Sequence, residues 1–414
     1  MGAPVKLAFN GMNNRTRLES VPEGKAQNAV NVQFSNTGEI LFPRAGKTLV
    51  YAGDTSSLYV GANITLFVEG GSLKKLNPDN TATVLKTGMG LSRVYYTNIA
   101  GTVYFANALA TGKVKNGVAS EWGTARPPRQ PDCIATQSGG LLAGTYGVVI
   151  TWIGSEESGT GRSTGVAVVD GGGITLTNFP TPPSYVTAVA VYVSSVNGDE
   201  FYLYGEYAPN TTVLSIGKAI SVVPLQTQFA YPPLPQQKVI KHMGRIYYSR
   251  GSQVYFTEPH RYGLQRPNNF FTFDSEVKVI ISAPPALYVN TATQLYRITN
   301  IDADTKPTGL DPGDGKPPKL DILQKGGAAS GSECADPDGT TFYFMSDRGF
   351  MSVTSEGAQA ITYADVAIPY FDTGASVVTE TEGLKYLTFI GSDGTQNPLA
   401  DPLYSAAELA RGSL

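Results

Sequence analysis

Few residues of this chain have the types and spacing that catalysis requires. His242 and His260 are the only histidines among 414 residues, and neither has a cysteine beside it. A Ser/His/Asp set drawn from distant segments of the chain stays open, because such sets are recognised by geometry rather than by sequence position. We interpret both histidines as stacking or hydrogen-bonding groups in the turns of a sheet, and we predict that the chain is not an enzyme.

An acidic, turn-rich segment over residues 301–321 could bind calcium, which takes oxygen ligands in flexible turns. Its aspartates are Asp302, Asp304, Asp311 and Asp314. The segment lacks the glutamate that closes the twelve-residue calcium-binding pattern. We therefore read it as a solvated surface loop and expect no metal site there.

The segment from Asp336 to Phe342 only approximates the aspartate turn of propeller sialidases, because Pro337 occupies the aspartate position. Glycoside hydrolysis would also require two carboxyl groups held around the sugar. No glycine-rich phosphate loop followed by Lys-Ser/Thr is present, so nucleotide hydrolysis has no support. We expect no cofactor.

Positive charge is concentrated in residues 238–266, where six cations accompany a single acid, Glu258. Tyrosines are interleaved with them, and this mixture can bind nucleic-acid phosphates and bases. The alternative is an interface with a neighbouring subunit, where arginine and tyrosine are preferred contacts. We favour the interface, because a channel through which DNA slides should not hold it. The candidates for subunit or channel contacts are Arg15, Arg17, Arg245, Arg250, Arg261, Arg266 and Tyr262.

Short hairpins recur along the chain and would carry these side chains. Each has two Tyr-rich apolar strands joined by a short turn of Gly, Asn or Ser, which is typical of β-hairpins. The pairs are 58–60 with 64–68, 94–96 with 103–105, 245–248 with 253–256, 286–289 with 294–298, and 342–345 with 349–353. Radial repetition of such units hides sheet edges in a β-propeller, and we interpret each hairpin as the inner half of a blade.

A different pattern lies between two proline-rich linkers at residues 126–131 and 231–235. Strands are predicted about every ten residues, which is typical of a β-sandwich. In the longest of them, Tyr146, Val148, Ile150 and Trp152 should share one face because strand side chains alternate. The predicted strands are 141–153, 165–169, 174–177, 187–194 and 200–207.

These patterns predict an all-β chain: a β-propeller with an inserted β-sandwich and an extended N-terminal arm. The predicted domains are an arm with the first strands over 1–45, a first propeller segment over 46–127, the sandwich over 128–232, a second propeller segment over 233–400, and a C-terminal tail over 401–414. Within that tail, residues 405–410 have a helical pattern that is too short to be stable alone.

The composition agrees with a turn-dense β protein rather than a disordered one: the chain has 46 Gly, 27 Pro, 23 Tyr and 17 Phe. The net charge of −3 excludes a global attraction to nucleic acid or to anionic membranes. Cys133 and Cys334 are too few for a disulfide framework, and we expect buried free thiols in a reducing cytoplasm. No signal peptide or long apolar span is recognisable, so we expect a protein that is neither secreted nor membrane-embedded.

Several stretches resemble one phage structural family. They are Asn13-Asn14-Arg15 with Pro22-Glu23-Gly24 and residues 28–32 in the arm, then 244–248, 258–264, Pro267 and 270–273, and the turn 346–349. The chain resembles the β-propeller tail proteins of tailed bacteriophages, that is, the nozzle or packaged-DNA stabilisation protein of short-tailed phages. The insert is similar to a fibronectin type III-like module, through a Gly-Thr-Tyr strand, a Glu-Glu-Ser-Gly tip, and residues 191–194 facing 201–203.

The resemblance implies a virion structural protein of the phage tail, assembled in the cytoplasm of the host bacterium. Such proteins form a homo-oligomeric ring, typically a hexamer, below the portal and adaptor. The ring contacts tail fibres or spikes, and it continues and closes the channel through which packaged DNA passes without sequence specificity.

Two other functions are compatible with such a chain. One is a module that binds a host-surface glycan or protein through exposed aromatic residues on the sandwich edge. Its candidate residues are Tyr185, Tyr192, Tyr202, Tyr204 and Tyr207, which could equally be core. The other is a propeller hydrolase, which the poor match at Asp336–Phe342 disfavours.

Overall fold

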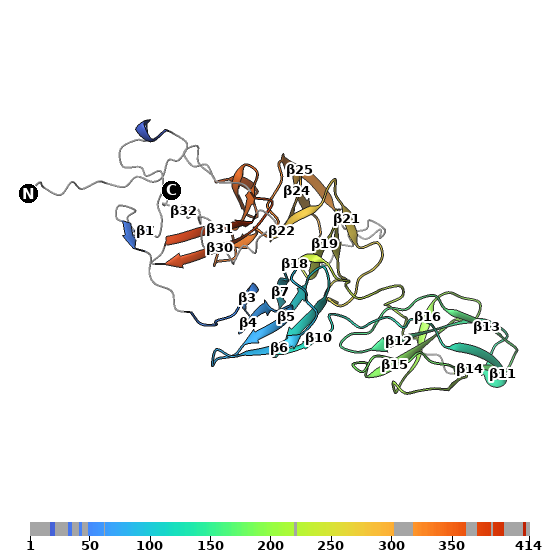
Figure 1. Cartoon of the computed structure of the whole chain (residues 1–414). Helices are drawn as coiled ribbons and strands as arrows, with labels where there is room; N and C mark the ends of the chain where they lie inside the picture. Colours follow the sequence, from blue (N-terminus) through green and yellow to red (C-terminus); the bar gives the residue numbers. More distant parts are fainter. Residues whose placement is uncertain are drawn as a thin grey trace, which may run out of the picture.

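The computed structural model consists almost entirely of β-strands (Figure 1). It describes residues 17–20, 32–34, 41–43, 49–61, 63–218, 222–301, 318–361, 371–381, 384–392 and 409–410. One 3-10 turn, η1 (Leu18–Ser20), is the exception among the described elements. None of these residues forms a helix of the length and apolarity that crossing a membrane requires.

Outside residues 132–216, five four-stranded antiparallel sheets occur in order along the described chain, and we call them blades 1 to 5. Blade 1 is β3 (Ser56–Gly61), β4 (Ile64–Glu69), β5 (Ser72–Leu76) and β6 (Ala82–Lys86); blade 2 is β7 (Tyr95–Ile99), β8 (Thr102–Ala106), β9 (Thr111–Lys115) and β10 (Val118–Ser120). Blade 3 is β18 (Gln237–His242), β19 (Arg245–Arg250), β20 (Gln253–Phe256) and β21 (Phe270–Thr272). Blade 4 is β22 (Val277–Ala283), β23 (Ala286–Thr291), β24 (Gln294–Thr299) and β25 (Lys319–Lys325); blade 5 is β26 (Cys334–Ala335), β27 (Phe342–Ser346), β28 (Gly349–Val353) and β29 (Ala358–Ala360). A terminal sheet follows, with β30 (Thr373–Thr381), β31 (Leu384–Ser392) and β32 (Leu409–Ala410).

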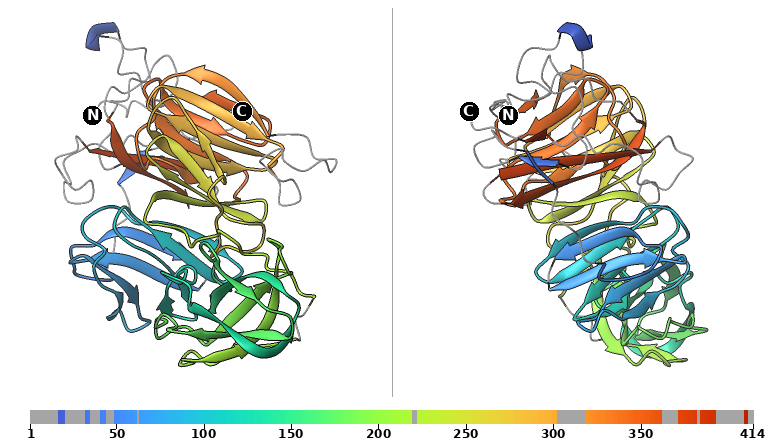
Figure 2. Two further views of the ribbon diagram at one scale, coloured as in Figure 1. Left: turned by 90° about the vertical axis from the view of Figure 1, so that its right-hand side faces the viewer. Right: turned by 60° about the vertical axis from the view of Figure 1, so that its left-hand side comes forward.

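Neighbouring residues in the blades point to opposite faces, and each face is buried against a different neighbour. In blade 3, Tyr247 packs toward blade 4 while Tyr248 packs toward blade 2. In blade 4, Leu287 faces blade 3 and Tyr288 faces blade 5. Consecutive aromatic residues in the Tyr-Tyr and Phe-Tyr-Phe runs therefore contribute to cores on opposite faces of the same blade. The first strands of blades 1 to 4 lie side by side. The prediction of an all-β, propeller-like fold is thereby confirmed, and Figure 2 shows its sheets from two further sides.

The recurring hairpins form as predicted, but not all of them are the inner half of a blade. The pairs β3–β4 and β7–β8 are the first two strands of their sheets. In blades 3 to 5 the hairpin is the middle pair, and β18, β22 and β26 precede it. A search for apolar runs misses β18 because it carries Gln, Lys and His side chains, and misses β26 because it has two residues.

Residues 132–216 form two sheets that face each other, and we call this unit the sandwich. One sheet contains β11 (Asp132–Leu141), β14 (Gly172–Thr177) and β17 (Leu214–Ile216); the other contains β12 (Gly144–Ile153), β13 (Thr164–Val168), β15 (Ala188–Ser194) and β16 (Phe201–Tyr207). Tyr146, Val148, Ile150 and Trp152 all point into the shared core, as the alternation predicted. β11 was not anticipated, because its residues are mostly exposed. The likeness to fibronectin type III and the predicted domain boundaries stay predictions.

Both ends of the chain are described only in short segments. In the predicted arm, β1 (Val32–Phe34) pairs antiparallel with β2 (Leu41–Pro43). At the other end, Leu409–Ala410 pairs with β31 as a strand, which corrects the helical interpretation of these two residues. Lys319–Asp321 belong to β25, where backbone pairing with β24 replaces the predicted loop. The four aspartates of the candidate calcium segment lie outside the described residues.

Truncation of the sandwich core tests the two-sheet arrangement. Ile150 is fully buried between the sheets, whereas Ile134 on β11 is exposed. Ile150→Ala should lower the free energy of unfolding by about 2–5 kcal/mol through lost burial and a residual cavity. Ile134→Ala is the matched control and should change it by less than about 0.5 kcal/mol. Equal effects in chemical denaturation would contradict the described core.

Candidate functional site

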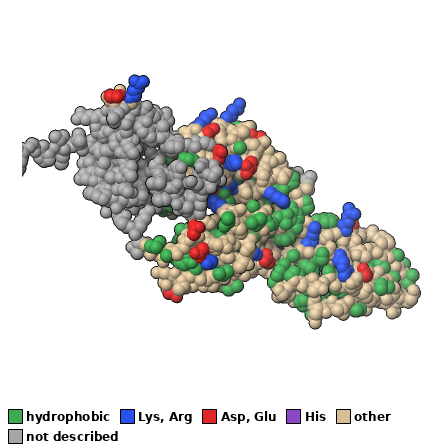
Figure 3. All heavy atoms as spheres, viewed as in Figure 1, with side chains coloured by type: hydrophobic (Ala, Val, Ile, Leu, Met, Phe, Trp, Pro, Cys, Tyr) green, Lys and Arg blue, Asp and Glu red, His purple; other side chains and the backbone are tan. Residues whose placement is uncertain are grey.

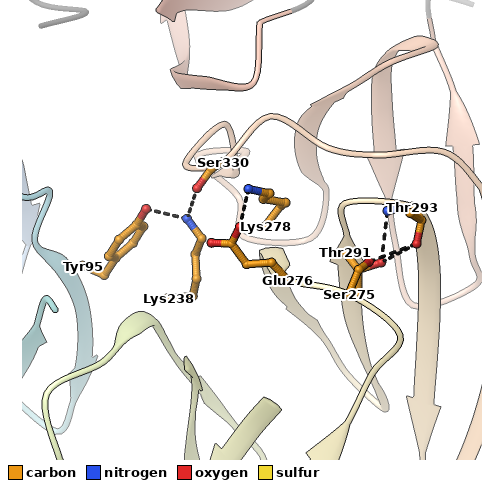
Figure 4. Close-up of polar contacts among 8 residues, drawn as sticks. All are labelled: Tyr95, Lys238, Ser275, Glu276, Lys278, Thr291, Thr293 and Ser330. Atoms are coloured by element: carbon orange, nitrogen blue, oxygen red, sulfur yellow. Dashed lines mark hydrogen bonds and ion pairs between the residues drawn. The ribbon is translucent and has the colours of Figure 1, made fainter. Parts of the chain in front are cut away.

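A buried lysine lies where three blades meet. Lys238 of β18 is 2% exposed, and its ammonium donates hydrogen bonds to the Tyr95 hydroxyl and to Ser330 Oγ at 2.7 Å (Figure 4). Its φ of 55° coincides with a bulge in β18, and non-glycine residues adopt this region at a cost. Within the described ranges the ammonium bonds to hydroxyl groups and forms no ion pair. Buried charge is tolerated only when it is hydrogen-bonded, so this cage has to stay assembled.

The three partners come from separate regions of the chain. Tyr95 begins the first strand of blade 2, Lys238 lies on the first strand of blade 3, and Ser330 precedes blade 5. Arg93 adds a second link, because its Nη1 donates to the carbonyls of Gly331 and Gly374, each at 2.7 Å. These contacts connect blades 2, 3 and 5 and the terminal sheet. The middle of the propeller-like body is therefore crossed by side chains.

The rest of Figure 4 lies at the edge of blade 4, where polar contacts secure the turn between β23 and β24. Glu276 and Lys278 form an ion pair at 2.6 Å, and Ser275 Oγ lies 3.0 Å from Thr293 Oγ1. The Asp274 carboxylate accepts hydrogen bonds from Thr291 and Thr293. These acids hold a loop in place. The described residues contain no group of three or more His, Cys, Asp or Glu side chains that could hold a metal.

His242 stacks and hydrogen-bonds as predicted, but it lies on strand β18 between blades 3 and 4 rather than in a turn. Its Nδ1 lies 2.9 Å from Ser282 Oγ, and its ring meets the Tyr247 ring edge-on. Burial lowers the pKa of His242 to about 4, so the ring is neutral at neutral pH. His260 is exposed in a turn, where its backbone N–H donates to the Gly244 carbonyl.

The two cysteines are free, as expected, although they are half-buried rather than fully buried. Burial raises the pKa of Cys133 to about 11 and that of Cys334 to about 12. Since the thiolate is the reactive form, both thiols are poor nucleophiles near neutral pH.

Two local patterns that resemble catalytic motifs serve the fold. The Asp336 carboxylate is buried and accepts the N–H of Asp338 at 3.3 Å, which closes the turn that loosely matched the sialidase pattern. From the sequence we expected no Gly-x-Ser-x-Gly elbow, but Gly161-Arg162-Ser163-Thr164-Gly165 has this spacing, which corrects that expectation. A nucleophile elbow requires a strand-to-helix turn, whereas this segment leads into strand β13.

The sandwich is seated on the blades through the tip of residues 155–159. The Glu156 carboxylate accepts the Gly263 N–H at 3.1 Å, and the Glu156 carbonyl accepts a hydrogen bond from Thr124 Oγ1 at 2.5 Å. Beside it, Trp122 Nε1 donates to the Tyr262 carbonyl at 2.7 Å. The tip thus contacts the segment after blade 2 and a loop of blade 3, and we call this contact the joint.

Backbone segments approach so closely at the joint that side chains do not fit. A Cβ atom on Gly123 would lie 2.2 Å from the Gly263 carbonyl oxygen, and one on Gly159 would lie 1.7 Å from the Ala230 carbonyl oxygen. Real Cβ atoms essentially never come within 3.0 Å of such atoms. The joint therefore depends on glycine at both positions.

Three of the candidate interface residues act at this joint or beside it. Arg261 donates to Gln226 Oε1 at 2.6 Å, and Arg266 donates to the Gln226 carbonyl at 3.0 Å while lying 3.3 Å from Glu258. The Tyr262 ring packs against Tyr104. The two arginines therefore fasten the segment that returns from the sandwich, which includes Gln226, to blade 3, whereas Tyr262 packs on blade 2.

The remaining candidates are dispersed. Arg245 is buried in blade 3, where it donates to the Thr257 carbonyl at 3.0 Å. This differs from the expected subunit or channel contact, because a run of positive charge does not show which side chains point inward. Arg250 and Arg17 are exposed, and Arg15 lies outside the described residues. On the face in Figure 3, Lys and Arg side chains are scattered rather than gathered in one patch.

The sandwich tyrosines do not form an exposed aromatic platform. Tyr192 is buried and donates to Glu157 Oε1 at 2.7 Å. Tyr202, Tyr204 and Tyr207 are half-buried, and only Tyr185 is exposed among the five. Their placement gives the host-binding alternative little support.

Sequence reasoning noted Lys238 only as a member of a charged run, and it missed Arg93, Tyr95 and Ser330. No signal in the sequence joins these residues, because they are separated by up to 237 positions and meet only when the blades pack. The positive φ at Lys238 could not be read from its residue type.

No protein-family model and no curated protein matches the chain. Solved structures that match over most of the chain include virginiamycin B lyase from Staphylococcus aureus and AztD from Citrobacter koseri. The lyase has 11% identity and a TM-score of 0.30, and the alignment covers 80% of this chain and 90% of that one. AztD has 10% identity and a TM-score of 0.28, with 80% and 78% covered. Likeness this low carries no argument about function.

Substitution at the joint tests the close backbone approach. Gly123→Ala would push a methyl group against the Gly263 carbonyl, so it should cost about 1–3 kcal/mol and loosen the joint. Gly161→Ala is the matched control, because nothing lies within 4 Å of its added Cβ. Thermal unfolding and protease cleavage in the 124–131 linker are the measurements. Unchanged cleavage in Gly123→Ala would contradict the described joint.

The joint should also weaken as the pH rises. Burial raises the pKa of Glu156, while Lys113, the Gly263 N–H and Arg261 oppose the shift only partially. The folded state therefore favours the protonated acid, and the resulting stability is present below the unfolded pKa and lost as the pH rises through the folded pKa. Relative to Glu156→Gln, the wild type should resist linker cleavage better at about pH 5 than at about pH 7.5. An unchanged difference between the two proteins at both pH values would refute this.

Proposed function

We propose that the chain is a structural protein of a bacteriophage tail, which forms a homo-oligomeric ring that extends and closes the DNA channel below the portal and adaptor. The motifs of the arm, of blade 3 and of the 346–349 turn support it by resemblance. The closed centre of the blades supports it from the geometry, and this observation carries most of the weight.

The closed centre bears on where DNA could pass. Hydrogen bonds of Lys238 and Arg93 link blades 2, 3 and 5 and the terminal sheet. Among the described residues, these contacts leave no route for a duplex between those blades. A protein of this shape can surround DNA only if several copies stand around it. The channel would then be a space between copies, with blades as its wall.

The charge distribution suits such a wall. Exposed cations at the joint are already engaged with Gln226 and Glu258, and the chain carries a net charge of −3. Binding to the DNA backbone strengthens with each phosphate that is neutralised. A wall whose cations are paired in this way would let DNA slide without sequence specificity. The role is geometric and requires no catalysis.

Negative-stain electron microscopy of the purified full-length protein tests this function, alone and mixed with the portal–adaptor complex of its own phage. A closed ring that caps the complex is expected, and its symmetry, expected to be six-fold, would be read directly. Monomers that do not bind the complex would overturn the proposal. They would shift the interpretation to a peripheral module that binds the host surface through the sandwich.

A further inference from the structure

Aromatic side chains form a continuous row across one face of blade 3. Tyr248 of β19, Tyr255 of β20 and Phe270 of β21 are register partners on neighbouring strands, so they share this face. The Tyr248 and Tyr255 rings are stacked with centroids 5.8 Å apart, and the Tyr255 and Phe270 centroids are 5.7 Å apart. Exposure increases along the row, from 2% at Tyr248 to 38% at Phe270. We call these three residues the aromatic row, and its outer end meets the solvent.

Two exposed arginines lie beside the row. Arg250 is on the same face, because it follows Tyr248 by two residues in β19. Burial raises the pKa of Tyr231 on the returning linker, and the neighbouring Tyr255 adds to this rise. Arg126 and Arg250 act in the opposite direction, so both guanidinium groups lie near the Tyr231 hydroxyl, and no Asp or Glu acts on it. Within the described part of the chain, neither arginine forms an ion pair.

The buried end of the row carries a hydroxyl group, that of Tyr248, with no hydrogen-bond partner among the described residues. Burial raises the pKa of Tyr248, and Tyr231 and Tyr255 add to the rise, so the three hydroxyls lie close together. The other two are engaged, because Tyr255 donates to Gln253 Oε1 at 2.6 Å and Tyr231 accepts from Gln265 Nε2 at 2.9 Å. Buried polar groups are rarely left unpaired. Tyr248 therefore offers a donor that a ligand oxygen can accept, directly or through a water.

These features select a ligand that is both flat and anionic. An exposed aromatic ring at the end of a row accepts another flat face, and nucleic-acid bases stack on such rings whatever their sequence. Arginines without a counter-ion attract an anion, and a guanidinium group matches phosphate oxygens with two parallel hydrogen bonds. A nucleotide carries both groups. The bases of a duplex are already stacked on one another, so only an unpaired strand has a base to offer.

We propose that the aromatic row and its two arginines bind single-stranded nucleic acid without reading its sequence. One base stacks on the outer end of the row at Phe270, and the phosphate next to it lies between Arg126 and Arg250. The charge complementarity fixes the position of the strand, and the stacked base distinguishes an unpaired strand from a duplex. Such a site goes beyond the proposed ring, because it needs only one copy of the chain.

Fluorescence anisotropy with the purified full-length protein and a labelled thymidine oligomer of about 12 nucleotides tests the stacking. The wild type should bind this oligomer more tightly than a blunt duplex of the same length. Phe270→Ala should weaken binding by at least about 5-fold, the lower end for the loss of one base–aromatic stack. Phe270→Tyr keeps the ring and should retain the affinity. Melting curves confirm that each variant is folded.

Salt titration of the same binding tests the arginines. Arg126→Ala and Arg250→Ala should each weaken binding and reduce the slope of log affinity against log salt by about 0.7 per lost phosphate contact. Arg162→Ala is the matched control, because it removes the same charge from an exposed loop of the sandwich, and it should change neither quantity. A wild type that does not bind the oligomer would overturn the site. Equal weakening by Arg162→Ala, equal affinity for the duplex, or equally effective displacement by a polyglutamate peptide would do the same, since each indicates a response to charge alone.

Discussion

The structure depends on one constraint: strand side chains alternate, so each middle strand of an interior blade supplies apolar residues to two cores at once. Tyr247 and Tyr248, or Leu287 and Tyr288, divide in this way between neighbouring sheets. Because every interior blade is held from both sides, the sheets stack in sequence order and their first strands come together. The polar cage of Lys238 exists only because that stacking brings residues from three blades to one point.

The joint uses a different kind of interaction. Apolar burial positions the blades, whereas the sandwich tip is held by hydrogen bonds to backbone groups and by glycines that allow main chains to touch. Such a contact fixes direction well, because a carbonyl and an N–H group meet over a narrow range of geometry. Arg261 and Arg266 beside the joint hydrogen-bond to Gln226, so part of the positive charge of this segment is engaged within the chain.

Local patterns predicted the local structure well. The hairpins, the sandwich strands and the shared face of Tyr146, Val148, Ile150 and Trp152 follow from period-two alternation and turn residues, and the structure confirms them. Strands without that signal were missed, notably β18 with its polar residues and β11 with its exposed ones. The polar cage of Lys238 could not be predicted, because its members are far apart in sequence. Residue type alone also does not show that the Arg245 side chain is buried while that of Arg250 is exposed. The arm, the fibronectin-like insert and the phage function stay predictions.

The position of the sandwich in the chain bears on how the blades assemble. Blades 2 and 3 share one apolar core, although the whole sandwich lies between them in sequence. Strands β11 and β17, at the two ends of the sandwich, both pair with β14, so folding of the sandwich brings these ends into one sheet. A folded insert shortens the loop that must close before blades 2 and 3 meet, and loop closure costs more entropy as the loop lengthens. A substitution in the sandwich core is therefore expected to slow the assembly of blade cores that lie outside it.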